Sequence, residues 1–565
     1  MRSRREFLQM AAVSASYFAA YPNFARAAAQ QRLTQNDLLK FDAKGQVTLL
    51  HLTDMHGQLK PVYFRPPSEN YGVGAFEGIP PHLVGKTFLE HFGIPAGSEY
   101  AYAHTMVDYV SLARGYGKLG GLDRTATLIK AIRAERGEDR VLLLDGGDTW
   151  QGSYSSLKTQ GADMVAAMKA LQPDAMVGHW EFTFGKDRVE ELIEEMGYPF
   201  LGSNCFDTEW EERVFESTAY FVRGGVSVAV IGQHFPYTPI ANPSHMVEGW
   251  SFGIRPEEIQ NNIDEARDNG AEIVVLLSHN GFDVDQKLAS ELTGLDVILT
   301  GHTHDAVPEA IRIGKTLVLS SGSHGKYLGR VDLKVENGQV VDTSSTLIPV
   351  FSDIITPDAE MTQLIDELRA PYEAECNRVI GQAGSLLYRR GNFNGSWDDV
   401  ICDAIREERD VEIALSPGFR WGTTLLPDMP ITIDDMYTQT SMNYPAVYRT
   451  EMTGEQLKVM LEDVCDNLFN TDPYYQQGGD MVRVGGMSYE CAPKQSIGNR
   501  IRNMTFTDTG ATIEAGRKYV VGGWASVNEN VEGPAIYDLL ENYITRKKVV
   551  QPSGAGRVKV IGMAG

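Results

Sequence analysis

The sequence is poor in cysteine and in basic residues. Five cysteines occur among 565 residues, and none has the C-x-x-C spacing of zinc or redox sites. Lysine and arginine number 51 against 75 aspartate and glutamate residues, which gives a net charge of −24. A chain this acidic is not expected to bind nucleic acid or an anionic membrane surface non-specifically. Beyond the N-terminus, no apolar run reaches the ~18 residues that indicate a membrane-spanning helix.

The first 27 residues are expected to be an export signal. Residues 3–8 (SRREFL) form a twin-arginine signature, and a mildly apolar, alanine-rich segment follows them. Residues 25–27 (ARA) offer a small-x-small cleavage site. Because the twin-arginine route carries folded proteins, we expect a bacterial periplasmic protein that takes up its metals before export. In that oxidising compartment the odd number of cysteines leaves at least one thiol unpaired in a monomer.

The mature chain is expected to fold as two α/β domains. From residue 47 to about 350, short β-rich runs alternate with helix-like segments, which is typical of a layered α/β domain. The expected parts are a first domain at 28–355, a linker helix at 356–379 and a second domain at 380–565. Helices of the first domain are expected at 123–137, 162–172 and 256–269. Pro371 is expected to perturb the linker helix, and capped helices of the second domain are expected to begin at Ser396 and Thr453.

A stretch at 58–117, rich in proline, glycine and tyrosine, interrupts this rhythm. Stretches of this length without secondary structure are often functional loops. Two interpretations remain open: the stretch lines the mouth of a site or docks a partner, or it is a structural flap.

Seven residues that can bind metal follow five apolar, strand-like runs. Because an open α/β sheet gathers the carboxyl ends of its strands at one edge, residues about 250 positions apart can meet there. Two carboxylates and five imidazoles suit two metals that share a carboxylate. The seven residues are Asp54, His56, Asp148, His179, His279, His302 and His304.

The ordered motifs D-x-H, G-D, G-H-x-E, S-H and G-H-x-H resemble the calcineurin-like metallophosphoesterases, and the long C-terminal block resembles their 5′-nucleotidase branch. The resemblance covers about residues 45–560. It implies an α/β/β/α sandwich carrying the metals, followed by a smaller α/β domain, with the active site in the cleft between them. It also implies two ligand sets that share Asp148: Asp54, His56, Asp148 and His304 for one metal, and Asp148, His179, His279 and His302 for the other.

One position departs from the pattern of this family. Its phosphoesterases carry G-N-H-E, in which the histidine assists the leaving group, whereas this chain has Gly178-His179-Trp180-Glu181. Histidine can replace asparagine as a ligand, but Trp180 cannot act as an acid. A sugar alkoxide needs such help, whereas a thiolate or persulfide leaves readily, because an ordinary cysteine thiol has a pKa near ~8.5. Trp180 therefore favours cleavage of a bond between sulfur and a sulfonate.

The G-H-W-E motif, the twin-arginine signal and residues 49–68 and 478–486 together resemble the thiosulfohydrolases of the bacterial sulfur-oxidation (Sox) system. That resemblance implies two manganese ions, and the ligand types alone fit Mn²⁺ or Zn²⁺. It implies an S-sulfosulfanyl-cysteine sulfohydrolase, which releases sulfate from a cysteine S-thiosulfonate on the carrier protein SoxYZ. Asp148 is then the bridging catalytic carboxylate, and Trp180 faces the substrate.

Three residues of the C-terminal block are candidates for binding substrate. Arg420 (SPGFRWG) aligns with an anion-binding arginine of the nucleotidase family, and a guanidinium fork suits a sulfonate as well as a phosphate. Asp480 and Arg483 lie in a glycine-flanked segment, where they either pair with each other or grip the carrier. His324 is expected beside the metal ligands or on the surface, and not as a ligand.

Two other functions remain open from the sequence. A periplasmic 5′-nucleotidase or cyclic phosphodiesterase agrees with the fold but not with Trp180. A non-catalytic protein that holds a sulfur carrier would not need all seven ligands.

Overall fold

The computed structural model describes residues 32–528, 530–553 and 556–563, so the expected signal at 1–27 lies outside the described residues. The chain packs as two compact units. Of the described residues, the first unit holds 32–62, Lys86–Gln151 and Thr159–Leu368. The second unit holds Tyr63–Gly85, Gly152–Lys158 and the described residues from Arg369 onward. Two short segments of the N-terminal half thus pack with the C-terminal half, which the sequence did not indicate.

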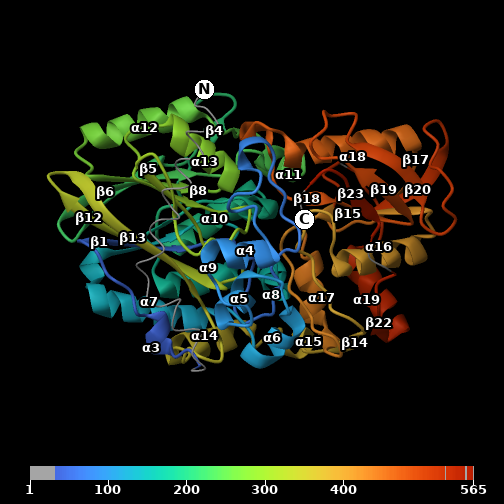
Figure 1. Ribbon diagram of the computed structural model, residues 1–565, viewed down its shortest axis with the longest axis horizontal. Coiled ribbons are helices and arrows are strands. Elements are labelled where there is room, and N and C mark those ends of the chain that lie inside the picture. The colour runs from blue at the N-terminus through green and yellow to red at the C-terminus, as the bar shows by residue number, and fades with distance from the viewer. Residues whose placement is uncertain (1–31, 529, 554–555, 564–565) are drawn as a thin grey trace. The chain divides into compact units, whose positions relative to one another are not determined.

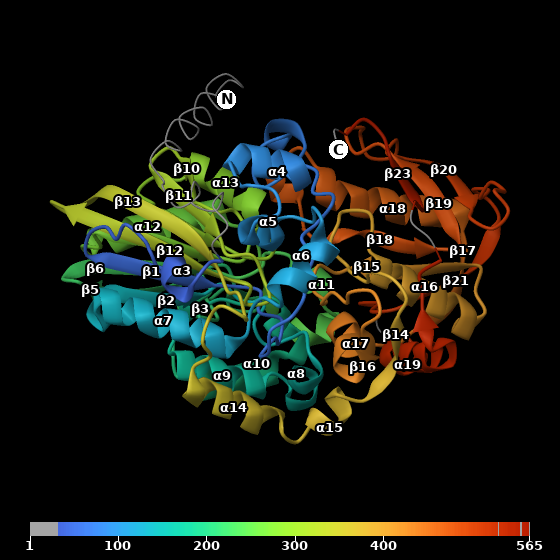
Figure 2. The same ribbon diagram turned by 60° about the horizontal axis from the view of Figure 1, so that its bottom comes forward.

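The first unit contains two stacked sheets (Figures 1 and 2). The five-stranded sheet has the order β13 (Gln339–Pro349), β12 (Tyr327–Glu336), β1 (Val47–Leu52), β2 (Val141–Asp145) and β3 (Ala175–Met176). The six-stranded sheet has the order β10 (Ile311–Ile313), β11 (Thr316–Ser320), β9 (Val297–Thr300), β8 (Ile273–Ser278), β6 (Val226–Gln233) and β5 (Thr218–Arg223). β1, β2 and β3 run parallel to one another, as do β6, β8, β9 and β11.

Apolar side chains from the facing sides of the two sheets form one buried core. Every residue of β1, β2, β8 and β9 is buried, which explains why these strands are continuous apolar runs. Alternate residues point into the core between the sheets, among them Leu49 and Leu144 from one sheet and Val275 and Leu299 from the other.

Helices cover the outer faces. α7 (Leu122–Arg136) and α9 (Ala162–Leu171) lie on the side of the five-stranded sheet, and α12 (Pro256–Asp268) and α13 (Phe282–Glu291) on the side of the six-stranded sheet (Figures 1 and 2). The three helices expected from the sequence in this region match α7, α9 and α12 to within one residue at each end. The predicted α/β/β/α sandwich is confirmed.

The expected linker helix is broken where proline was expected to perturb it. α14 (Ala359–Arg369) ends two residues before Pro371, and α15 (Glu373–Cys376) begins two residues after it. Proline cannot donate the backbone hydrogen bond that a continuous helix would need there. The division between the two units falls at the end of α14.

The second unit is also α/β. Its largest sheet has the order β17 (Tyr448–Thr453), β21 (Lys518–Gly523), β15 (Ile413–Gly418) and β18 (Asp480–Gly485), and a smaller one has the order β20 (Ile501–Phe506), β19 (Met487–Cys491) and β23 (Val558–Val560). α16 (Ser396–Arg409) and α18 (Gly454–Phe469) pack against β18.

One of the two predicted caps is right and the other is wrong. Thr453 caps α18, and Gln456 completes the reciprocal capping box. α16 does begin at Ser396, but its N-cap is Gly395 and Ser396 makes no capping hydrogen bond. The Ser396 hydroxyl instead donates to the carbonyl of Leu386 at 2.7 Å. The hydroxyl is therefore used by the loop before the helix and does not cap the helix.

Hydrogen bonds of its backbone attach the segment Tyr63–Gly85 to the second unit. The Thr424 N–H donates to the Tyr63 carbonyl at 2.7 Å, and the Arg65 N–H donates to the Thr424 hydroxyl at 2.9 Å. Val73 lies in the same buried core as Phe469. Among the described residues, no helix is both long and apolar enough to cross a membrane.

Candidate metal centre

All seven predicted ligands lie just past the carboxyl ends of strands in the first unit. Those from the five-stranded sheet follow β1 (Asp54, His56), β2 (Asp148) and β3 (His179). Those from the six-stranded sheet follow β8 (His279) and β9 (His302, His304). The candidate centre therefore draws ligands from both layers of the sandwich, where the expectation was a single sheet edge.

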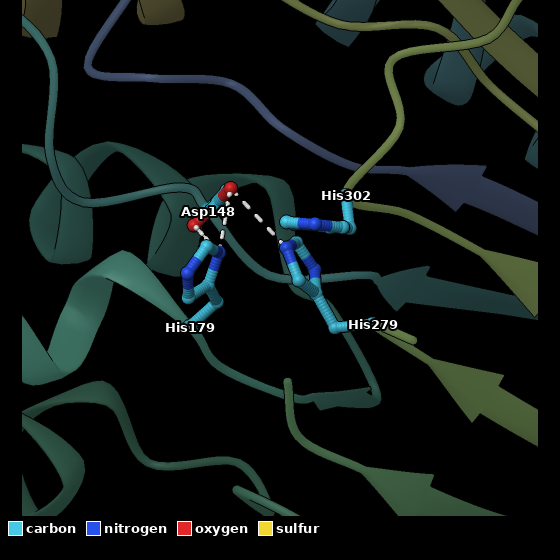
Figure 3. Close-up of side chains that lie close together, drawn as sticks. All are labelled: Asp148, His179, His279 and His302. Atoms are coloured by element: carbon cyan, nitrogen blue, oxygen red, sulfur yellow. Dashed lines mark hydrogen bonds and ion pairs between the residues drawn. The ribbon is translucent and has the colours of Figure 1, made fainter. Parts of the chain in front are cut away.

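The seven side chains form two buried groups that share Asp148. In each group, one possible ligand atom per residue lies within 4.8 Å of all the others. Figure 3 shows Asp148 interacting with both His179 and His279, beside His302. The members are Asp54, His56, Asp148 and His304 in the first group and Asp148, His179, His279 and His302 in the second, which are the two sets that the family resemblance implies.

Ring nitrogens and carboxylate oxygens converge within the first group. The Nε2 atoms of His56 and His304 are 3.0 Å apart. Nε2 of His304 is 3.2 Å from Oδ1 of Asp54, and Nε2 of His56 is 3.6 Å from Oδ2 of Asp148. Nitrogen and oxygen donors without thiolate suit Mn²⁺ or Zn²⁺, and two such groups fit a dinuclear site.

The backbone supports the interpretation of a functional site. Five of the seven residues have a positive φ, a conformation that is uncommon outside glycine and costs of order 1–3 kcal/mol when it is sparsely populated. These left-handed turns place the ligand side chains at the ends of the strands. The residues are Asp54 (52°), His56 (47°), Asp148 (55°), His302 (73°) and His304 (57°). Asp54 and His56 thus share a group because of these turns, and not through the alternation of an extended strand.

Burial and neighbouring charges shift the pKa values of the ligand residues. Burial lowers the pKa values of His56 and His179, which favours the neutral imidazole that a metal requires. Burial raises the pKa of Asp54 to about 6, because the carboxyl is removed from water. Burial opposes ionisation of Asp148 as well, but His179 and His279 outweigh it and hold its pKa well below the usual value.

His279 has a defined orientation. Its Nδ1 lies 2.5 Å from the carbonyl of Gly146, so that nitrogen donates and Nε2 faces Asp148, 3.2 Å from Oδ2. Although burial lowers the pKa of His279, the charge of Asp148 outweighs burial and raises it to about 10. A divalent cation at Nε2 would displace the proton that this pKa describes. A backbone carbonyl that accepts from the other ring nitrogen is a usual partner of a ligating histidine.

Glu181 is a functional residue that the motif contained but that sequence reasoning left without a role. Its buried carboxylate accepts hydrogen bonds from the N–H groups of Thr149 at 2.6 Å and His179 at 2.8 Å. It accepts longer ones, of 3.2 Å, from Asp148 and Trp150. Glu181 therefore ties the loop of Asp148 to the turn of His179.

His234 and Phe235, after β6, were also missed. The N–H of Gly178 donates to Nδ1 of His234 at 2.9 Å, and the N–H of Phe235 donates to the Gly178 carbonyl at 3.1 Å. The Phe235 ring packs on His179 and His302, with centroid distances of 4.0 and 4.2 Å. These two residues hold both polar groups of Gly178 and cover two ligand rings.

His324 lies beside the centre, as one of the two interpretations expected. Its buried ring is 5.4 Å from His56 and 5.9 Å from His304, centroid to centroid. Its backbone N–H donates to the carbonyl of Asp54 at 2.8 Å. It belongs to neither ligand group and instead supports the loop that carries Asp54.

The three candidates of the second unit share one charge cluster. Asp480 accepts from Arg420 Nε and from Arg483 Nη2, both at 3.3 Å, and Arg390 Nη1 lies 3.5 Å from it. Burial opposes its ionisation, but these arginines lower its pKa. Arg483 also donates to the Gly391 carbonyl at 2.7 Å. Asp480 and Arg483 thus pair with each other, which is the first of the two interpretations left open.

Comparison with known proteins agrees with this geometry. Residues 47–306 match the calcineurin-like phosphoesterase family, and residues 380–551 match the C-terminal domain of 5′-nucleotidases. The solved structure of the sulfate thiohydrolase SoxB from Thermus thermophilus is 34% identical, with a TM-score of 0.90, covering 93% of this chain and 98% of that one. A 5′-nucleotidase precursor, also from Thermus thermophilus, has the same fold at 20% identity and a TM-score of 0.72, covering 92% and 100%.

A curated relative extends the comparison. The snake venom 5′-nucleotidase of Crotalus adamanteus is 26% identical over an alignment of 321 residues, and the match covers 51% of this chain and 53% of that protein. The chain thus spans about half the length of this relative. The matched families cover both the metal-bearing sandwich and the C-terminal block. The chain therefore belongs to the 5′-nucleotidase branch of the calcineurin-like metallophosphoesterases.

Proposed function

We propose that this chain releases sulfate from a cysteine S-thiosulfonate on the carrier protein SoxYZ, in the bacterial periplasm. The observation that carries the proposal is Trp180. It stands where phosphoesterases of the family have the histidine that assists the leaving group. Its side chain is buried and packs against the ring of His179, with centroids 4.7 Å apart. The 34% identity to a protein named sulfate thiohydrolase supports the same substrate class.

The chemistry of the leaving group explains why tryptophan is tolerable there. Hydrolysis of the thiosulfonate joins a water oxygen to the sulfonate sulfur and breaks its bond to the carrier sulfur. The products are sulfate, a proton and a carrier persulfide. A cysteine thiol has a pKa near ~8.5, far below that of a nucleoside hydroxyl, so a thiolate or persulfide leaves without a proton more readily than an alkoxide does. Only the alkoxide requires a proton donor at position 180.

The residues of the chain hold and shape the centre. Asp148 is fixed by the Trp180 N–H and, through its own N–H, by Glu181. Phe235 covers His179 and His302, which excludes water from that side of the ligands. Two divalent ions, Mn²⁺ in our proposal with Zn²⁺ as the alternative, would supply a nucleophile from water at neutral pH and positive charge toward the sulfonate. We further propose that Arg420 binds the sulfonate oxygens, because a guanidinium fork fits them.

The main alternative is a 5′-nucleotidase or cyclic phosphodiesterase. The 26% identical snake venom relative and the shared fold favour it, whereas Trp180 speaks against it. A non-catalytic carrier-binding protein is a second alternative. The two complete, buried ligand groups speak against that one, since a protein that only holds a carrier would not need them.

The test compares two substrates on one preparation. Sulfate release from SoxYZ carrying a cysteine S-thiosulfonate is measured beside phosphate release from AMP, and bound metal is counted per chain. The proposal expects two metals, rapid sulfate release and little phosphate. Phosphate without sulfate would establish the nucleotidase instead, and absence of metal and of both activities would favour the binding protein. D148N, which removes the shared charge, is the control and should abolish sulfate release.

A further inference from the structure

Two of the five cysteines lie together in the core of the second unit. Cys465 is in the last turns of α18, and Cys491 is the last residue of β19. Their sulfur atoms are 3.5 Å apart, and both side chains are fully buried. In the described part of the chain, which contains all five cysteines, this is the one pair of thiols at hydrogen-bond distance.

The surroundings hold both residues in place. Cys465 and Cys491 belong to one apolar cluster with Leu461, Phe469 and Tyr489. Sulfurs in a disulfide are ~2.05 Å apart, so the pair must approach by roughly 1.5 Å. An approach of this size would come from rotation about the Cα–Cβ bonds of the two residues.

We propose that Cys465 and Cys491 form a disulfide that fastens α18 to β19. The oxidant is an organic or protein disulfide. Each cysteine loses its proton, and one sulfur attacks the oxidant to form a mixed disulfide and release the oxidant's first sulfur. The second cysteine sulfur then attacks the first within this mixed disulfide and displaces the oxidant's other sulfur. One Cys–Cys bond forms, the oxidant's sulfur–sulfur bond breaks, and its two sulfurs leave as thiols that carry the two protons. Both cysteine sulfurs are oxidised, and both oxidant sulfurs are reduced.

The other cysteines do not offer an equivalent pair. Cys205 lies in the first unit, Cys376 ends α15, and Cys402 is on α16. Each is buried. A single disulfide would leave the other three thiols reduced.

The cross-link would stabilise the part of the second unit that carries the charge cluster. β19 follows β18 after the single residue Gly486, and β18 carries Asp480 and Arg483. The two cysteines are 26 positions apart, so the bond would close a loop of that size in the unfolded chain. The hydrogen bond to Cys491 and burial raise the pKa of the Cys465 thiol, so oxidation of the folded protein should be slow.

The test counts free thiols by mass. Full-length protein is incubated for a day in oxidised and reduced glutathione, and a second sample is refolded from urea in the same buffer with divalent metal. Both are acidified, denatured, alkylated with N-ethylmaleimide and weighed. The proposal expects three alkylated cysteines of the five, and five after reduction. Five alkylated cysteines in both oxidised samples would overturn it.

Two matched variants identify the pair. C402A removes a buried cysteine outside the pair and should leave two alkylated thiols, whereas C465A breaks the pair and should leave four. The reverse pattern would assign the bond to Cys402 and would contradict the proposal. As a second readout, reductant should lower the unfolding midpoint of the wild type by roughly 5–10 °C and leave that of C465A unchanged.

Discussion

The backbone N–H of Trp180 donates a hydrogen bond of 2.8 Å to Oδ1 of Asp148. The main chain of residue 180 therefore orients the carboxylate that both ligand groups share, whatever side chain the residue carries. Since the indole itself makes no part of this contact, position 180 can be changed without removing the support of Asp148. The side chain and the backbone of Trp180 can thus be tested separately.

The variant W180H should gain activity on a phosphate ester and not on the thiosulfonate. Histidine can protonate an alkoxide, and general acid catalysis is worth ~10²–10⁴-fold, so we expect AMP hydrolysis to rise at least tenfold. Sulfate release should change less than threefold. W180F, which keeps an apolar ring, is the control and should gain neither activity. A large rise in thiosulfonate hydrolysis by W180H would contradict the argument from the leaving group.

The two ligand groups predict separate losses of metal. H304A removes a ligand of the first group alone and H179A one of the second group alone, so each should bring two metals per chain down to one. D148A touches both groups and should lose both metals. Elemental analysis after dialysis measures the counts, and H245A, at an exposed histidine outside the groups, should keep two. If H304A and H179A each lost both metals, the two groups would not bind their metals independently.

The Nδ1 acceptor of His234 should matter for the metal bound through His179. Because it holds the N–H of Gly178, H234L leaves that buried donor without its partner, while the side-chain oxygen of H234N can replace Nδ1. We expect H234L to weaken binding of one metal by ~10–100-fold and to lower kcat with little change in KM. H234N should recover most of the metal affinity and most of kcat. Equal defects in the two variants would show that His234 acts only by filling space.

The ligand positions could be predicted from the sequence because the evidence for them is local. An apolar run that ends in aspartate or histidine places the side chain at a strand end, and parallel strands bring such ends together. His234 shows the limit of that rule. It also follows an apolar strand, β6, but its ring packs between Phe200 and Phe215, with centroids 4.8 and 5.1 Å away. Position after a strand therefore does not decide which way a histidine points.

Two further features could not be predicted because they depend on contacts far apart in sequence. Glu181 accepts hydrogen bonds from the backbone N–H groups of Thr149 and Trp150, more than 30 positions earlier. Because every residue except proline has such an N–H, the sequence does not indicate which ones a carboxylate will bind. The segment 63–85 has no hydrophobic periodicity, so nothing in it indicates that it packs with residues near 392 and 424. Its partners are fixed by hydrogen bonds such as that from the Tyr71 N–H to the Asn392 side chain, at 2.6 Å.

The stability of the second unit should depend on pH through Asp399. Burial raises the pKa of this carboxyl to about 7, although Arg557 lies 3.2 Å away. In the unfolded chain the group ionises near pH ~4, so the folded state binds the proton more tightly, and stability falls as pH rises from about 4 to about 7. The amide of D399N cannot ionise, so the variant does not lose stability in this way as the pH rises. The unfolding free energy of D399N relative to wild type should therefore rise by roughly 2–3 kcal/mol between pH 5 and pH 8, measured by urea unfolding. A constant difference would show that Arg557 keeps Asp399 ionised in the folded protein.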